Sequence, residues 1–181
     1  MNTNKYNDSG GIYCFFPFER FDDYDNGVFK IGNTEQSFQQ RLNQYHTYFV
    51  GGVWVICLIK VYAKRGKYLP SNFKHILNII EDYVMKEIVK EGGIIILDKR
   101  RVWKQGQSEW IYTNPNIVKK CFQKTVTHFK TIYKDLGFLL DSSDIKKTIK
   151  EVNDNYQENM KQKEKYLAEY IFNINKFVNQ K

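Results

Sequence analysis

Two cations, a carboxylate and two tyrosines in the first half of the chain are the residues that could act on a phosphate group. Arg41 has Tyr45 four residues later, on one face of a predicted helix. A guanidinium stays charged and contacts phosphate oxygens through two parallel hydrogen bonds. In most helices such an arginine is an ordinary surface residue. Here Tyr13, Lys30 and Glu81 could converge with it on one concave face, which favours a phosphate site.

Glu81 is the carboxylate that helix geometry singles out. Its neighbours on the same side of the helix are apolar: Leu77 and Val84 one turn away, and Ile88 two turns ahead. A carboxylate at the border of a core needs a cation or several hydrogen-bond donors. Two interpretations stay open: a salt bridge to an arginine or lysine, and a ligand for Mg²⁺ together with water and substrate phosphate. Glu87, by contrast, has charged residues three and four positions later, which predicts a solvated side chain.

A β-hairpin must position Tyr13 and Lys30. Residues 11–18 and 28–32 each have the composition of a strand, and the acidic turn between them ends in Asn-Gly, a strong hairpin signal. Tyr13 and Lys30 should then face the same side. Glycine inside a strand marks a close approach of another group. We expect the glycines beside these two residues to let the backbone approach a phosphate.

Further helices and strands complete a predicted α/β unit that ends near Asn114. The apolar run 53–62 predicts a strand that is buried on both faces between helices. Helices are predicted over residues 34–48 and from Ser71, as N-cap, to about residue 91. Residues 94–97 and 109–112 predict two short strands.

The composition changes after Asn114, where Asn-Pro predicts the start of a helix that ends before Gly137. A longer helix should start near Ser143, with an apolar seam that shifts at Met160 as in a coiled-coil stutter. Residues 115–181 contain 13 lysines and 8 acidic residues. We therefore divide the chain into a polar tail (1–10), an α/β domain (11–114) and a basic helical extension (115–181). The extension could contact DNA, form a homodimer through a coiled coil, or pack back onto the domain.

The net charge of +8 on 181 residues favours an anionic partner, with nucleic acid as the first candidate. The longest apolar run, 50–62, is interrupted by Lys60 and is too short to cross a bilayer. The first ten residues lack the apolar core of a signal peptide. We expect an intracellular, non-secreted protein without a membrane partner. Nucleus, cytoplasm and viral factory are not distinguished.

The three cysteines, Cys14, Cys57 and Cys121, are far apart in the sequence and form no Cys-X-X-Cys pair. Their number and spacing argue against a zinc site and favour reduced thiols in a reducing compartment.

Four features in order along the chain resemble the GIY-YIG nuclease superfamily: GIY at residues 11–13, KIGNT at 30–34, Arg41 and Glu81. The segments FKIGNT, IIEDYV and SEWIYT are similar to the branch common in phages and large DNA viruses, often labelled a DNA-binding domain. The resemblance covers roughly residues 11–113. It implies a three-stranded antiparallel sheet flanked by helices. It also implies a DNA endonuclease that hydrolyses phosphodiester bonds with one divalent ion, which is Mg²⁺ or, as a substitute, Mn²⁺.

The resemblance also implies roles for individual residues. Tyr13 would lie beside the nucleophilic water, Arg41 would stabilise charge on the scissile phosphate, and Glu81 would hold the metal. Tyr45 stands where the family uses Tyr or His, with His46 as the alternate.

Lys30 replaces the tyrosine of YIG, and an ammonium supplies charge where a phenol could relay a proton. Asn114 is the nearest candidate for the family's late asparagine. The substitution at Lys30 leaves phosphate binding intact and keeps a second hypothesis open, a DNA-binding module that cleaves weakly or not at all. A third is an oligomeric structural protein whose long helices carry the function.

A basic cluster with an aromatic neighbour could extend the nucleic-acid interface: Lys99, Arg100, Arg101 and Trp103. Cations and aromatic rings are commonly paired in nucleic-acid grooves. The alternative is a solvated loop. RNA stays open as an alternative substrate.

Overall fold

The computed structural model describes residues 9–17, 26–45, 48–49, 52–64, 72–96 and 110–178, without the side chains of 156, 159, 160, 163, 170 and 173–178. These residues form six strands and four α-helices. In chain order they are β1 (Ser9–Pro17), β2 (Gly27–Thr34), α1 (Phe38–Tyr45), β3 (Val53–Ala63), α2 (Phe73–Lys90), β4 (Ile94–Ile95), β5 (Trp110–Thr113), α3 (Pro115–Ile132), β6 (Leu136–Leu139) and α4 (Ser143–Val178).

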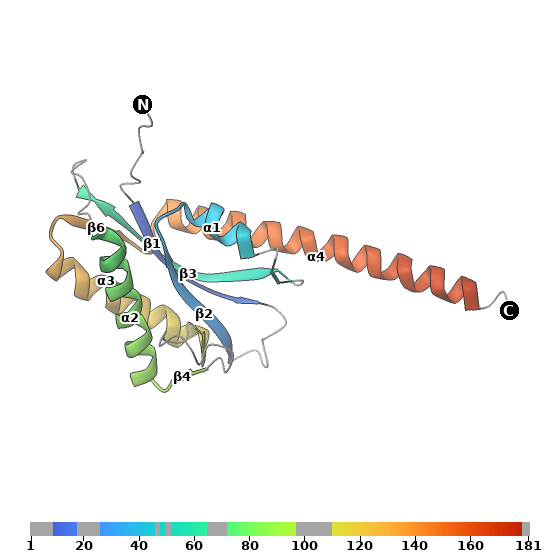
Figure 1. Cartoon of the computed structure of the whole chain (residues 1–181), viewed down its shortest axis with the longest axis horizontal. Coiled ribbons are helices and arrows are strands. Elements are labelled where there is room, and N and C mark those ends of the chain that lie inside the picture. The colour runs from blue at the N-terminus through green and yellow to red at the C-terminus, as the bar shows by residue number, and fades with distance from the viewer. Residues whose placement is uncertain are drawn as a thin grey trace, which may run out of the picture.

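The six strands form one antiparallel sheet in the order β4-β5-β2-β1-β3-β6 (Figure 1). The predicted α/β class is therefore confirmed. The three-stranded sheet is not confirmed, because β5 adds to the outer side of β2 and β6 adds to the outer side of β3. The predicted β1–β2 pairing is present, with Tyr13 opposite Gly32 and Phe15 opposite Lys30.

Side chains of the sheet alternate between two cores, as successive residues of a strand must. On one side Ile12 and Cys14 pack with residues of α2 and α3; we call this the α2 face. On the other side Tyr13 and Phe15 pack with residues of α1 and α4; we call this the α1 face. Strand β3 contributes to both cores, which confirms the prediction of a strand buried on both faces.

Helix α4 covers the outer edge of β3. Strand β6 pairs only with residues 60–63 of β3, so the preceding part of that edge needs other partners. The carboxamide of Asn153 supplies them at Val55. Its Oδ1 accepts from the Val55 N–H at 2.8 Å, and its Nδ2 donates to the Val55 carbonyl at 3.1 Å. The buried backbone of a strand edge is thereby hydrogen-bonded by a helix side chain.

Residues after Asn114 build part of the same sheet and both of its faces. Asn114 caps α3 through its side-chain oxygen, which accepts from the Asn116 N–H at 2.8 Å, as the Asn-Pro pattern predicts. Gly137 was expected to end the helix but lies inside β6 instead. A Cβ on Gly137 would come within 2.1 Å of the Tyr62 ring, so that ring requires a glycine there.

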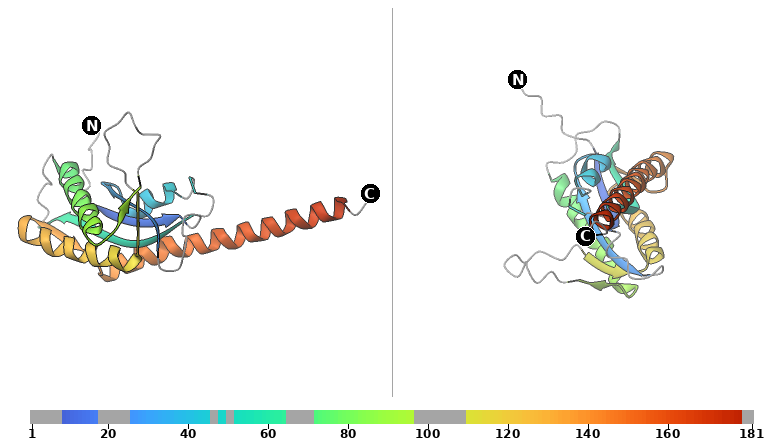
Figure 2. Two further views of the ribbon diagram at one scale, coloured as in Figure 1. Left: turned by 90° about the horizontal axis from the view of Figure 1, so that it is seen from below. Right: turned by 90° about the vertical axis from the view of Figure 1, so that its right-hand side faces the viewer.

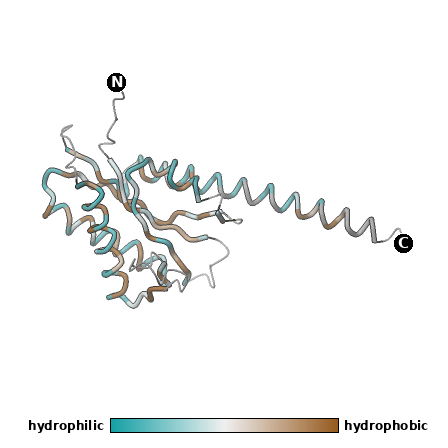
Figure 3. Tube along the Cα trace, viewed as in Figure 1, coloured by the Kyte–Doolittle hydropathy of each residue, from teal (hydrophilic) through white to brown (hydrophobic). Residues whose placement is uncertain are grey.

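The first part of α4 packs on the body, and the rest continues well past it toward the C-terminus (Figures 1 and 2). Ile145 and Val152 are buried in the core of the α1 face. From residue 154 onward every described side chain of α4 is exposed. Hydrophobic residues gather along the sheet and α2, whereas the part of α4 just beyond the body is mainly hydrophilic along its trace (Figure 3).

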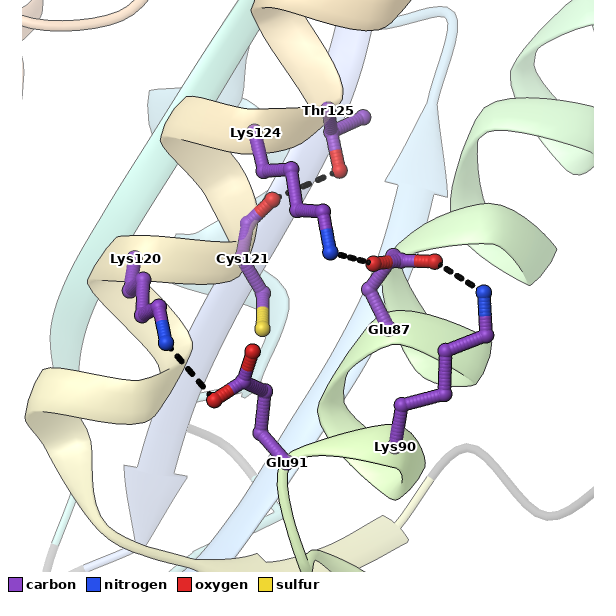
Figure 4. A network of polar contacts seen from close by, with 7 residues as sticks. All are labelled: Glu87, Lys90, Glu91, Lys120, Cys121, Lys124 and Thr125. Carbon is purple, nitrogen blue, oxygen red and sulfur yellow. Dashed lines mark hydrogen bonds and ion pairs between the residues drawn. The ribbon is translucent and has the colours of Figure 1, made fainter.

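Glu87 is the buried carboxylate of α2, which corrects the prediction that it is solvated. Its side chain is 2% exposed and forms ion pairs with Lys90, at 2.5 Å, and with Lys124 of α3. A second ion pair between α2 and α3 joins Glu91 and Lys120 at 2.7 Å (Figure 4). The hydrogen bonds from Lys124 and Lys90 lower the pKa of Glu87 below its usual value.

All three cysteines are buried free thiols. Cys14 and Cys57 are opposite each other across β1 and β3. Burial raises the pKa of Cys57 to about 12. Within the described ranges, no helix combines the length and apolar character needed to span a membrane.

Candidate functional site

Three of the predicted site residues are joined by hydrogen bonds on the α1 face. The hydroxyl oxygens of Tyr13 and Tyr45 are 2.9 Å apart, and Nη2 of Arg41 donates to the Tyr45 hydroxyl at 3.1 Å. The guanidinium also lies 5.0 Å from the centre of the Tyr45 ring, within cation–π range. The predicted placement of Arg41 and Tyr45 one helical turn apart thus brings both side chains to Tyr13.

The local sequence fixes where α1 starts and hence where Arg41 points. The Ser37 hydroxyl accepts from the Gln40 N–H at 3.2 Å, and the Thr34 hydroxyl accepts from the Gln36 N–H at 3.0 Å. Such side-chain acceptors satisfy N–H groups that a helix start or a turn leaves free. The link from β2 to α1 is therefore short and held by its own side chains.

The two motif glycines make room for aromatic rings. A Cβ on Gly32 would be 2.5 Å from the Tyr13 hydroxyl oxygen, because the Tyr13 ring lies across that position. A Cβ on Gly11 would be 2.3 Å from the ring of Phe38, the first residue of α1. The expectation that these glycines admit a phosphate to the backbone is wrong at both positions. They let Tyr13 and α1 pack directly on the sheet.

The Tyr13 hydroxyl remains protonated at neutral pH. The side chain is 1% exposed. Burial is the largest cause, and the hydrogen bond with Tyr45 the next, of a pKa that is raised well above the usual range of tyrosine. Tyr13 can therefore donate a hydrogen bond or pass a proton along the chain to Tyr45. A phenolate at this position is strongly disfavoured.

Lys30 is buried beside the same cluster, with 7% of its surface exposed. Its ammonium lies 5.8 Å from the centre of the Tyr45 ring and 5.4 Å from that of Trp110. Aromatic faces attract a cation at these distances. The strand register confirms the prediction that Lys30 and Tyr13 face the same side of the hairpin, because Lys30 is opposite Phe15 and Tyr13 is opposite Gly32.

Trp110 was not among the predicted site residues. It pairs with Lys30 in the β2–β5 register, and its ring contacts Phe15 and Phe49, at centroid distances of 6.4 and 6.0 Å. The segment SEWIYT predicts a strand, but the sequence does not show that this strand pairs with β2 and so places Trp110 opposite Lys30. Trp110 supplies one wall of the Lys30 environment.

Glu81 lies on the α2 face, separate from the Tyr13–Tyr45–Arg41 chain. Its Oε2 accepts a hydrogen bond from the side-chain amide of Asn33. Asn33 is opposite Ile12 in the β1–β2 register, and Tyr13 is opposite Gly32. Successive residues of a strand point to opposite faces, so Asn33 and Tyr13 are on different sides of the sheet. The structure does not bring all five predicted residues to one face.

Three polar residues that sequence reasoning missed accompany Glu81. Asn33 Nδ2 also donates to Asn78 Oδ1 at 2.9 Å, and Lys74 Nζ donates to Asn33 Oδ1. Lys74, Asn78 and Glu81 follow spacings of four and three, which put them on one side of α2. Two sequence patterns could have predicted the cluster. One is the alternation of faces along KIGNT, which puts Asn33 on the side opposite Lys30; the other is the polar line on α2.

Glu81 and Asn78 offer one carboxylate and one carboxamide to a hard cation. Oxygens of Glu81 and Asn78 converge on one amide group, and carboxylate and carboxamide oxygens are ligands that Mg²⁺ accepts together with water. The nearby Lys74 ammonium opposes a second positive charge. Among the residues that the structure describes, no group of three or more His, Cys, Asp or Glu side chains could hold a metal ion. A cation at Glu81 would therefore keep several water ligands.

The other predicted site residues are placed as follows. Asn114 caps α3 by its side chain. His46, Lys99, Arg100, Arg101 and Trp103 lie outside the described residues.

Comparison with known protein families, with characterised proteins and with solved structures gives no significant match to this chain.

Proposed function

We propose that this protein binds DNA by holding a backbone phosphate at Arg41, and that it hydrolyses a phosphodiester bond with a divalent cation held by Glu81. The observation that carries the proposal is the hydrogen-bonded chain Tyr13–Tyr45–Arg41 beside the buried ammonium of Lys30. The GIY and KIGNT motifs, which resemble the GIY-YIG nucleases, and the net charge of +8 support it.

Each residue of the hydrogen-bonded chain Tyr13–Tyr45–Arg41, and Lys30 beside it, has a defined part in this proposal. Arg41, half-buried at the edge of the cluster, binds the phosphate oxygens, and its position is fixed by the Tyr45 hydroxyl. Lys30 adds positive charge behind that site. Tyr13, which stays protonated, donates a hydrogen bond to the Tyr45 hydroxyl or accepts one from it. Its role is to orient and transfer protons, and the base that activates water has to come from elsewhere.

Glu81, with the Asn78 oxygen, would hold Mg²⁺ on the α2 face. When bound, the ion shields the charge that builds up on phosphate oxygens during hydrolysis. Asn33 positions both ligands through its amide group. Arg41 and Glu81 lie on opposite faces of the sheet, so a DNA backbone that contacts both has to run past the end of β2, where Thr34 leads into α1.

The second candidate is a DNA-binding module of the same fold without cleavage. The contacts of Glu81 with Asn33 on the face opposite Tyr13, together with Lys30 in place of the YIG tyrosine, favour it. Both candidates require Arg41 for DNA binding, and only the first requires Glu81 for activity.

Nicking of supercoiled plasmid and binding of a short DNA duplex separate the candidates. Wild-type protein should nick with Mg²⁺ or Mn²⁺, and Glu81→Ala should abolish nicking and keep binding. Arg41→Ala should weaken binding and reduce the slope of log K against log salt by about 1, since one phosphate contact is lost. Nicking should fall by about 10²-fold or more.

Lys130→Ala is the matched control, because it removes one positive charge from an exposed site on α3. Its effect on the salt slope should be smaller than that of Arg41→Ala. Intact binding without nicking under any divalent cation would select the binding module. DNA binding that is equally strong in Arg41→Ala and wild type would refute both candidates.

A further inference from the structure

The projecting half of α4 carries exposed apolar residues on the side that the proximal half buries. Leu167 is 59% exposed and Ile171 is 50% exposed. Leu167 follows Ile149 by 18 residues, which is five complete turns of an α-helix, so both project from the same side. Ile149 packs against the core of the α1 face. The apolar line of α4 thus continues beyond the body that covers its first part.

The apolar period of the sequence continues to the end of α4. In sequence, Leu167 and Ile171 are followed at spacings of three and four by Ile174 and Val178, which are also within α4. Spacings of this kind are typical of a helix that packs against another helix. The segment 154–178 is about 37 Å long. Packing of an apolar face supplies most helix stability in proteins, and within one chain every described side chain of this segment is exposed.

The charges of this segment favour a copy of the same chain as the partner helix. Residues 154–178 contain four acidic and four basic residues: Asp154, Glu158, Glu164, Glu169, Lys161, Lys163, Lys165 and Lys176. The net charge of +8 is therefore carried entirely by the rest of the chain. A neutral segment with both signs interspersed has little attraction for DNA, and it meets an identical segment without net repulsion.

We propose that the protein forms a homodimer in which the projecting parts of α4 from two chains pack along the line of Leu167 and Ile171. The proposed interface lies on the projecting part of α4 and includes none of the residues Tyr13, Tyr45 and Arg41. The dimer does not depend on the DNA-binding proposal, and it is expected in the absence of nucleic acid.

The test is the molar mass of the full chain, measured without DNA by light scattering or sedimentation over a wide concentration range. We expect about 43 kDa, twice the 21.6 kDa of one chain. The double variant Leu167→Glu, Ile171→Glu should have the mass of one chain, because it places charges in the apolar line. Circular dichroism of both proteins checks that α4 remains helical.

Gln162→Glu with Asn155→Glu is the matched control, since it adds two negative charges at exposed positions away from that line. This control should stay dimeric. A monomeric wild type at all concentrations, a Leu167/Ile171 variant that keeps the mass of a dimer, or a control that dissociates equally would each overturn the proposal.

Discussion

Replacement of Asn153 by alanine should detach α4 from the edge of β3 and destabilise the whole fold. The Asn153 side chain makes two hydrogen bonds to the backbone of Val55, at 2.8 and 3.1 Å, and is 7% exposed. Truncation leaves both the N–H and the C=O of Val55 without a partner in a buried environment. A buried polar group without a partner costs about 1–3 kcal/mol. Two such groups give an expected loss in the free energy of unfolding of about 2–6 kcal/mol.

Asn155→Ala is the control, because Asn155 is an exposed residue of the same helix two positions later. Alanine has a better helix propensity than asparagine by about 0.5 kcal/mol, and this gain is shared by both variants. Urea unfolding followed by circular dichroism gives the difference between them. Hydrogen exchange of the Val55 amide should accelerate in Asn153→Ala alone. Equal stability of the two variants, with unchanged exchange at Val55, would refute the argument that Asn153 closes the edge.

Two further predictions concern Gly32 in β2 and the ion pairs of Glu87 between α2 and α3. Gly32→Ala should lower the free energy of unfolding by about 1–3 kcal/mol, because the new methyl group displaces the Tyr13 ring; a variant as stable as wild type would show that the ring moves freely. Glu87 has a lowered pKa in the folded protein, so its ion pairs stabilise the fold above the unfolded-state pKa of about 4.3 and are lost as pH falls through the folded-state value. Thermal unfolding between about pH 6 and 3 should therefore depend less on pH in Glu87→Gln than in wild type, and identical profiles would contradict the assignment.

Local patterns predicted the parts of the molecule that depend on neighbours in sequence. The hairpin of β1 and β2, the cap of α3 at Asn114, and the juxtaposition of Arg41 and Tyr45 one turn apart are all confirmed by the structure. The meeting of Tyr13 with Tyr45 also follows, because α1 is tied to the end of β2 by a link of three residues, 35–37, which leaves it little freedom.

Long-range register decided the features that sequence reasoning missed. Glu81 and Glu87 both border apolar residues in α2, and only the position of α3 makes Glu87 the buried one, through Lys124. The placement of Glu81 on the face opposite Tyr13 depends on which residue of KIGNT meets α2. Gly137 carries the same local signal as a helix terminator, but the Tyr62 ring requires it within β6.

The change in composition at Asn114 suggests a domain boundary, but a truncation there would remove part of the sheet and two of its covering helices. A fragment that ends there would lack both β6 and α4, which together cover the outer side of β3. Its uncovered N–H and C=O groups would form a template for cross-β association, and such a truncated protein should aggregate even though every residue of the Tyr13–Tyr45–Arg41 chain is retained. The C-terminal third of the polypeptide therefore covers the edge of β3 and should keep the sheet from associating with other chains.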